Sequence, residues 1–146
     1  MTKLFHFDSP ADDYQADACV LTCFDARFEL VIRKFLRRRG AAVYDQIKIP
    51  GAAKALAAPV NDGDRDFVLR MIETSVALHH SPRMILTAHN QCGAYLGRPA
   101  EEIAADLDRA AEVVRAAQPS LAIERYFLDF DGVYVAPSWL EGWSVK

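Results

Sequence analysis

The chain has 146 residues, of which 51% are hydrophobic and 25% are charged, a composition that is ordinary for a globular protein. A formal net charge of -3 gives no reason to expect a nucleic-acid partner or an acidic membrane surface. We find neither a signal peptide nor an apolar stretch that could span a membrane, and an odd count of 3 cysteines favours a reducing, cytoplasmic setting. We therefore expect one cytoplasmic domain over residues 1–146.

The first part of the chain predicts a strand and a helix after a polar lead-in. Residues 1–16 show no periodicity, whereas residues 18–22 form a short, largely apolar run, typical of a buried strand in a parallel sheet. The helix that follows has one apolar face and stops at Gly40. The apolar positions of that face are Phe28, Val31, Ile32, Phe35 and Leu36.

A second strand and a second helix are predicted in the next part of the chain. The strand covers residues 43–49 and ends at Pro50-Gly51, but the alanine-rich residues 52–63 predict no definite element. Asp64 is the expected N-cap of the helix, which ends at Ser81-Pro82. The apolar face of this helix consists of Phe67, Val68, Met71, Ile72, Ser75 and Leu78.

The last part of the chain predicts a strand, a helix and a closing pair of strands. Residues 84–88 form the third strand, and Pro99 suits the first turn of the helix that follows. Residues 121–129 and 133–135 are the closing strands, joined by a turn at Asp131-Gly132. Residues 137–146 form an aromatic tail, and we expect Trp139 and Trp143 in it to pack on the domain or on a second subunit.

The alternation of strands and helices predicts an α/β fold with a mostly parallel central sheet, helices on both faces and an antiparallel final strand. If the second and third strands flank the first, the strand order reverses between the first and third strands, and open α/β sheets bind ligands beyond the carboxyl ends of strands at such a point.

Two motifs follow those two strands and suggest the chemistry of the site. Cys23-Phe24-Asp25-Ala26-Arg27 follows the first strand, and His89-Asn90-Gln91-Cys92-Gly93 follows the third. Two thiolates and one imidazole are ligands that zinc prefers, and three protein ligands leave one position open for water, as in catalytic sites. We therefore predict a Zn²⁺ site formed by Cys23, His89 and Cys92.

Asp25 and Arg27 lie beside the first predicted ligand, and three roles are open for the carboxylate. It can accept a hydrogen bond from a zinc-bound hydroxide while Arg27 keeps it ionised and oriented. It can instead occupy the fourth zinc position and close the site. The simplest role is that of a helix cap, which is common for aspartate at the start of a helix.

The two motifs resemble the signature of the β-class carbonic anhydrases, C-x-D-x-R after the first strand and H-x-x-C-G after the third. The resemblance covers about residues 18–135, including the order of strands and helices. It implies that Cys23, His89 and Cys92 are zinc ligands and that Asp25 and Arg27 form the dyad that orients the zinc hydroxide. The implied reaction is the reversible hydration of carbon dioxide to bicarbonate, and the implied assembly is a homodimer or a higher homo-oligomer.

The chain departs from the family pattern at three places. Ala26 stands where serine is common, Ile49 and Pro50 replace an Asn-Ala pair beside the metal, and the chain is short before its first strand, where family members usually carry helices that embrace a partner subunit. The changed wall keeps two alternatives open. One is a hydrolase of carbon disulfide or carbonyl sulfide on the same site, and the other is a non-catalytic, zinc-stabilised scaffold.

The remaining cysteine, histidines and arginines have simpler explanations. We expect Cys19 to be a core residue, His79 and His80 to be solvated at the end of a helix, and His6 to have no role. The basic cluster at residues 33–39 is expected to be a solvated helix end that complements the helix dipole, not a nucleic-acid patch.

Overall fold

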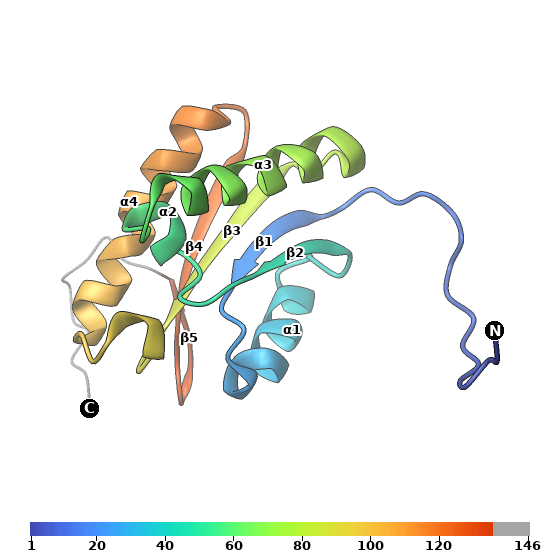
Figure 1. Ribbon diagram of the computed structural model, residues 1–146, viewed down its shortest axis with the longest axis horizontal. Helices are drawn as coiled ribbons and strands as arrows, with labels where there is room; N and C mark the ends of the chain where they lie inside the picture. Colours follow the sequence, from blue (N-terminus) through green and yellow to red (C-terminus); the bar gives the residue numbers. More distant parts are fainter. Residues whose placement is uncertain (136–146) are drawn as a thin grey trace.

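The computed structural model of the chain describes residues 1–135, which form a five-stranded sheet with helices around it (Figure 1). The predicted aromatic tail, with Trp139 and Trp143, lies outside the described residues. The strands are β1 (Ala18–Thr22), β2 (Tyr44–Lys48), β3 (Arg83–His89), β4 (Ala122–Asp129) and β5 (Gly132–Val135). The helices are α1 (Glu29–Arg38), α2 (Lys54–Ala57), α3 (Asp62–His79) and α4 (Ala100–Ala117), with short 3₁₀ turns η1 (Ala26–Phe28) and η2 (Gly93–Tyr95).

The strand order is β2-β1-β3-β4-β5, so β2 and β3 flank β1, which is the condition under which the two motifs meet. β1, β2, β3 and β4 are parallel to their neighbours, and β5 runs antiparallel to β4. The order reverses between β1 and β3, so the carboxyl ends of these two strands open onto one crevice. Both predicted motifs begin at that edge of the sheet.

The two faces of the sheet are covered by different helices, with α1 on one side and α2, α3 and α4 on the other (Figure 1). Strand alternation in β1 explains this division, because successive side chains point to opposite faces. Val20 packs with Ile32 of α1, whereas Leu21 packs with Ile72 of α3 and Leu107 of α4. β1 is therefore buried on both sides, as its apolar sequence predicts.

Two predictions about the segment before α3 need correction. Residues 52–63 contain the one-turn helix α2, whose Leu56 is fully buried. Asp64 is not the N-cap of the next helix: α3 begins at Asp62, and the side chain of Asn61 caps it by accepting a hydrogen bond from the Asp64 backbone N–H at 3.1 Å. Asn and Asp are both good N-caps, and only the backbone path decides which of them occupies that position.

His80 is exposed as expected, whereas His79 is only partly exposed, because its ring pairs with an aspartate and a tyrosine. His79 Nδ1 lies 2.8 Å from Asp45 Oδ2, and the ring stacks on Tyr14 with centroids 4.1 Å apart. The same carboxylate accepts hydrogen bonds from Tyr14 at 2.6 Å and from Ser75 at 2.6 Å. This cluster ties the end of the polar lead-in to β2 and α3.

The Asp45 cluster predicts a specific acid sensitivity of folding. Burial by itself raises the pKa of Asp45, but the hydrogen bonds from Ser75, Tyr14 and His79 outweigh it and leave the pKa below its usual value. A carboxyl group with a lowered pKa in the folded state stabilises that state at neutral pH, and the contribution is lost as the pH falls through the folded-state pKa. Asp45→Asn is expected to lower the free energy of unfolding by on the order of 1–3 kcal/mol at neutral pH.

Urea unfolding of the wild type and of Asp45→Asn across a series of pH values checks this prediction. The difference between the two proteins should shrink as the pH falls below about 4, where the carboxyl group is protonated in the unfolded chain. Asp13→Asn changes an exposed carboxylate of the lead-in and is the matched control, expected to have no comparable effect. A difference that stays constant down to the lowest pH would contradict the assignment.

Candidate metal centre

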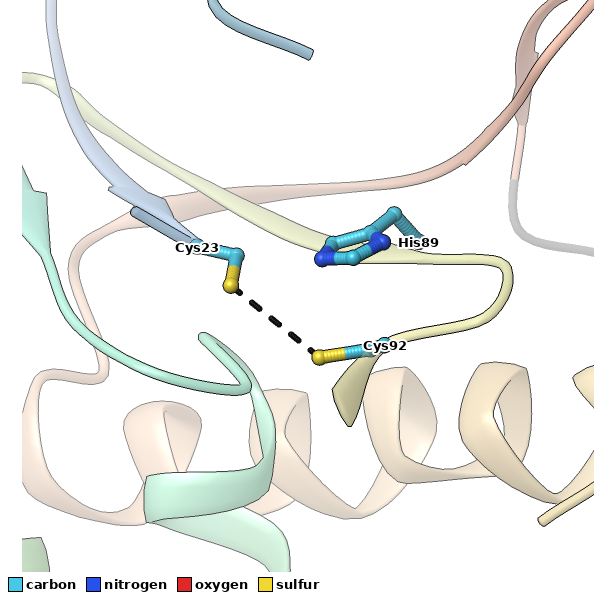
Figure 2. Close-up of side chains that lie close together, drawn as sticks. All are labelled: Cys23, His89 and Cys92. Atoms are coloured by element: carbon cyan, nitrogen blue, oxygen red, sulfur yellow. Dashed lines mark hydrogen bonds between the residues drawn. The ribbon is translucent and has the colours of Figure 1, made fainter. Parts of the chain in front are cut away.

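The three predicted ligands lie together at the crevice between β1 and β3 (Figure 2). Cys23 directly follows β1, His89 is the last residue of β3, and Cys92 lies in the loop after it. One donor atom from each residue lies within 4.8 Å of the others, and the two sulfur atoms are 4.0 Å apart. Adjacent parallel strands therefore bring together side chains that are far apart in the sequence.

The imidazole of His89 is oriented by its surroundings. The ring is 3% exposed and stacks on Phe28 with centroids 4.5 Å apart. Nδ1 lies 2.9 Å from the backbone carbonyl of Asn90, and this contact assigns the ring proton to Nδ1 and leaves a lone pair on Nε2. Nε2 is buried and has no hydrogen-bond partner among residues 1–135. A buried nitrogen with a free lone pair beside two sulfur atoms has the position and tautomer that a metal ligand needs.

The two thiols share one hydrogen bond, and this interaction dominates their acidity. It lowers the pKa of Cys23 to about 4, while the same contact and burial raise the pKa of Cys92. The backbone N–H of Gly51 acts on both sulfur atoms and lowers the pKa of each. One thiol of the pair thus ionises readily, and thiolate is the form that binds metal.

Gly51 approaches the sulfur atoms because it lacks a side chain. Its φ of +77° lies in the left-handed region, and a Cβ there would come within 3.1 Å of the Cβ atoms of both Ala94 and Lys54. Neighbouring Ala52 also has a positive φ, 47°, which is strained for a residue with a Cβ. The sequence marks this position as the Pro50-Gly51 strand end but does not reveal its contact with the thiols.

The donor group fits a tetrahedral metal ion. Zinc–sulfur bonds of about 2.3 Å at tetrahedral angles separate two thiolates by about 3.8 Å, close to the 4.0 Å between Cys23 and Cys92. The unpartnered Nε2 of His89 supplies the third donor. The three donor atoms already lie within 4.8 Å of one another, so they need little rearrangement to bind an ion.

Asp25 lies beside this group and is held by Arg27. The guanidinium donates from Nε to Asp25 Oδ1 at 3.0 Å and from Nη2 to Oδ2 at 2.6 Å, and the Arg27 backbone N–H donates to Oδ1 at 3.0 Å. These hydrogen bonds lower the pKa of Asp25 to about 2, so the carboxylate is ionised at neutral pH. Asp25 Oδ2 is 3.9 Å from His89 Nε2. Asp25 is also the N-cap of η1, so the cap role and the pairing with Arg27 coexist.

Arg27 has further contacts that the sequence did not predict. Its Nη2 donates to the Gln91 carbonyl at 3.2 Å, and its guanidinium lies 5.3 Å from the ring centroid of Phe130. Asn90 donates to Asp129 Oδ1 at 3.0 Å, which ties the metal loop to the β4–β5 turn. In the sequence, only the position of Asn90 directly after His89 suggested a role for it at the site. No local sequence pattern indicated that Phe130 contacts Arg27.

The metal centre opens into a cavity of about 410 Å³, whose lining includes Cys23, Asp25, Arg27 and Cys92. Pro50 and Ala94 line both this cavity and a neighbouring, largely apolar groove of about 500 Å³. Ile49 lies in the groove, beside Pro50. Of the unusual Ile49-Pro50 pair, Pro50 therefore lines the site cavity, whereas Ile49 lines only the neighbouring groove.

Comparison with known proteins gives the relationship of the chain. The sequence profile of the family described as "Putative carbonic anhydrase" matches residues 14–136, which include both motifs. The chain belongs to this family. The sequence is also similar to that of an uncharacterized protein of Rickettsia bellii. The two are 24% identical over 131 residues, and the alignment covers 82% of this chain and 80% of the relative.

Solved structures show the same fold for this carbonic anhydrase family member. A β-carbonic anhydrase of Trichomonas vaginalis, isoform I, superposes on this chain with a TM-score of 0.62 at 13% identity. The superposition includes 90% of this chain and 87% of the β-carbonic anhydrase chain. The metal-free form of a carbon disulfide hydrolase superposes with a TM-score of 0.51 at 14% identity. This superposition includes 91% of this chain and 89% of the hydrolase chain. The predicted β-carbonic-anhydrase-like fold is thereby confirmed. Within residues 1–135, no helix has the length and apolar character needed to cross a bilayer.

Proposed function

We propose that this protein is a zinc enzyme that reversibly hydrates carbon dioxide to bicarbonate. The observation that carries the proposal is the arrangement of an Arg27-held carboxylate 3.9 Å from the free nitrogen of a Cys-His-Cys donor group. Membership of the carbonic anhydrase family supports the same reaction. Cys23, His89 and Cys92 are the proposed ligands.

Zinc is the proposed metal because two thiolates and one imidazole match its preferred donors. When bound, zinc supplies a Lewis acid that lowers the pKa of water and so makes a nucleophile available near neutral pH. Cys23 and Cys92 line the cavity of about 410 Å³, so a small molecule could reach a metal ion that they held. Cys23 and Cys92 together balance the charge of the ion.

Asp25 and Arg27 are the proposed dyad that orients the attacking water. An ionised carboxylate accepts a hydrogen bond but cannot donate one, so Asp25 selects one orientation of the water and aims its lone pair at the carbon of the substrate. Arg27 holds the carboxylate through the two-point contact and keeps it ionised. This engagement of both Asp25 oxygens by Arg27 favours the dyad over the role of fourth zinc ligand.

Hydrolysis of carbon disulfide or carbonyl sulfide is the second candidate. Two observations favour it: the fold matches a carbon disulfide hydrolase, and Pro50 lines the site cavity beside an apolar groove that Ile49 also lines. Both sulfur compounds are linear and less polar than bicarbonate, so an apolar wall suits them. The chemistry of Asp25 and Arg27 is the same for either substrate, because each reaction begins with attack of water on a central carbon.

We also propose that the protein is a homo-oligomer, because β2 lies at the edge of the sheet and pairs with β1 on one side only within residues 1–135. An open strand edge beside the metal centre invites a second copy of the chain. Light scattering of the zinc-loaded protein measures the assembly, and a mass equal to the 16.3 kDa of one chain would contradict the proposal.

Stopped-flow measurement of carbon dioxide hydration tests the proposed function, after metal analysis confirms about one zinc ion per chain. The rate should rise between about pH 6.5 and 9, because the attacking water must lose a proton. A rate equal to that of buffer with zinc bound would contradict carbon dioxide as the substrate. Release of hydrogen sulfide from carbon disulfide by the same sample would then support the second candidate.

A further inference from the structure

Phe130 lies at the tip of the turn between β4 and β5, and the fold gives little reason for a phenylalanine there. Turns of two residues favour glycine, asparagine and aspartate, whereas this turn consists of Phe130 and Asp131. Phe130 is 55% exposed and packs in neither of the two core clusters that the described part of the chain forms. Its ring therefore contributes little to the core, and its contacts near the metal centre need another explanation.

The ring of Phe130 lies against the proposed dyad. Its centroid is 5.3 Å from the Arg27 guanidinium and 5.5 Å from the ring of Phe28, which in turn stacks on His89. The guanidinium is also 5.8 Å from the Phe28 centroid. A cation within about 6 Å of an aromatic ring centroid is attracted to the ring. Arg27 therefore has two aromatic neighbours in addition to its hydrogen bonds to Asp25.

The turn that carries Phe130 is fixed to the metal loop. The Phe130 backbone N–H and the side-chain amide of Asn90 both donate to Asp129 Oδ1, at 2.8 and 3.0 Å. The Asn90 backbone N–H donates to the Leu128 carbonyl at 2.9 Å. These hydrogen bonds hold the backbone that carries the ring, so folding alone places the ring beside Arg27.

Arg27 needs such a neighbour because its side chain is 48% exposed. An ion pair between exposed groups is weak, since holding a long side chain in one geometry costs rotamer freedom and water competes for the charge. A contact with a fixed ring favours the geometry in which the guanidinium faces Asp25. We propose that Phe130 is a positioning residue, whose ring keeps the Arg27 guanidinium on Asp25 and so keeps that carboxylate aimed at the metal site.

Phe130 acts through Arg27 and touches neither metal nor substrate. When the guanidinium turns out to water, Asp25 loses the hydrogen bonds from Nε and Nη2 and keeps the one from the Arg27 backbone N–H. The carboxylate can then rotate, and the attacking water is oriented for a smaller fraction of the time. This inference rests on the proposed function, in which Asp25 orients that water.

Phe130→Leu is the decisive variant, because leucine keeps an apolar side chain but has no aromatic ring. Its kcat/KM for carbon dioxide hydration is expected to fall about two- to fivefold, the factor that a cation–π contact at an exposed site supplies. Phe130→Tyr keeps the ring and should keep the wild-type rate. The dissociation constant for zinc should be the same in all three proteins, because Phe28 stands between the Phe130 ring and His89.

NMR of the Arg27 Nε–H group in the zinc-free protein gives a second measurement that does not depend on activity. Hydrogen exchange of this group should accelerate about two- to fivefold in Phe130→Leu, because the hydrogen bond from Nε to Asp25 opens more often. Exchange should stay at the wild-type rate in Phe130→Tyr. Backbone amides of β1 and β3 should exchange equally in all three proteins, whereas a residue that only stabilised the fold would change them.

Phe67→Leu is the matched control. Phe67 is 49% exposed and the Arg70 guanidinium lies 5.9 Å from its ring, but Phe67 lines the neighbouring groove and not the cavity of the metal centre. This variant should keep the wild-type kcat/KM and the wild-type exchange of the Arg27 Nε–H group.

Four results would each overturn the proposal. They are wild-type rate and exchange in Phe130→Leu, a loss in Phe130→Tyr as large as in Phe130→Leu, an equal loss in Phe67→Leu, and weakened zinc binding in Phe130→Leu, which would assign the ring to the metal loop. A zinc-loaded wild type without hydration activity would instead reject the proposed function. Exchange of the Arg27 Nε–H group would still decide whether the ring holds the guanidinium.

Discussion

Asp25→Asn is expected to lower kcat/KM for carbon dioxide hydration by at least about 100-fold while leaving zinc bound. General acid–base and orienting groups contribute on the order of 10²–10⁴ to rate, and the variant removes the negative charge without changing the size of the side chain. The pKa of about 2 means that the wild-type carboxylate is fully ionised across the working pH range. An amide in its place can also donate a hydrogen bond, so it no longer selects one orientation of the attacking water.

The same variant separates the enzyme from a zinc-stabilised scaffold. In a scaffold with Asp25 as the fourth ligand, Asp25→Asn would change the dissociation constant for zinc, and the wild type would show no turnover to lose. Stopped-flow rates and zinc content are therefore measured on the same samples. Asp12→Asn, which changes an exposed carboxylate in the lead-in, serves as the control and should keep the wild-type rate. Wild-type activity in Asp25→Asn would remove the carboxylate from the mechanism.

Cys92→Ser is expected to weaken zinc binding by more than about 100-fold, because loss of an outer partner alone costs about 10–100-fold. A serine hydroxyl stays protonated at neutral pH and is a poor zinc ligand, whereas the buried Cys92 sulfur lies 4.0 Å from that of Cys23. Metal analysis after dialysis against a moderate chelator should find zinc in the wild type and almost none in the variant. A ligand that binds only the folded state also stabilises it, so zinc removal should lower Tm in the wild type but not in Cys92→Ser.

Cys19→Ala provides the matched control for the thiols. Cys19 is fully buried in the core, and burial raises its pKa to about 11, so it is a neutral core side chain as predicted. The control should keep its zinc and lose only a modest amount of stability, on the order of 1 kcal/mol, for the small cavity that it leaves. Equal zinc content in Cys92→Ser and the wild type would contradict the three-ligand site.

The sequence reached the fold and the donor group because both depend on local patterns. Alternating apolar strands and amphipathic helices specify a parallel sheet, and two motifs at strand ends specify where the donors go once the order of β1 and β3 is known. The order itself was only a condition in the sequence argument, and the structure supplies it. Element boundaries were less certain: His89 proved to lie inside β3, and Asn61 proved to be the cap of α3.

Contacts between distant residues were beyond the reach of local patterns. His79 and Asp45 are 34 residues apart in the chain, and nothing near either residue in the sequence indicates that the two side chains pair. The approach of Phe130 to Arg27 and of Gly51 to the two thiols depends in the same way on how loops from different strands meet.

The sequence by itself determined which groups are available for the proposed chemistry: two cysteines and a histidine at strand ends, with an aspartate and an arginine beside them. Tertiary structure decided their arrangement, since the 4.0 Å between the sulfur atoms of Cys23 and Cys92 and the burial of His89 come from residues far along the chain. The tautomer of His89 and the ionisation of Asp25 come from near neighbours, Asn90 and Arg27, once the folded loops bring them into contact. The physical reason is that residue type and spacing set what a side chain can do. Burial, hydrogen-bond partners and packing, which only the folded chain supplies, set its protonation and its direction.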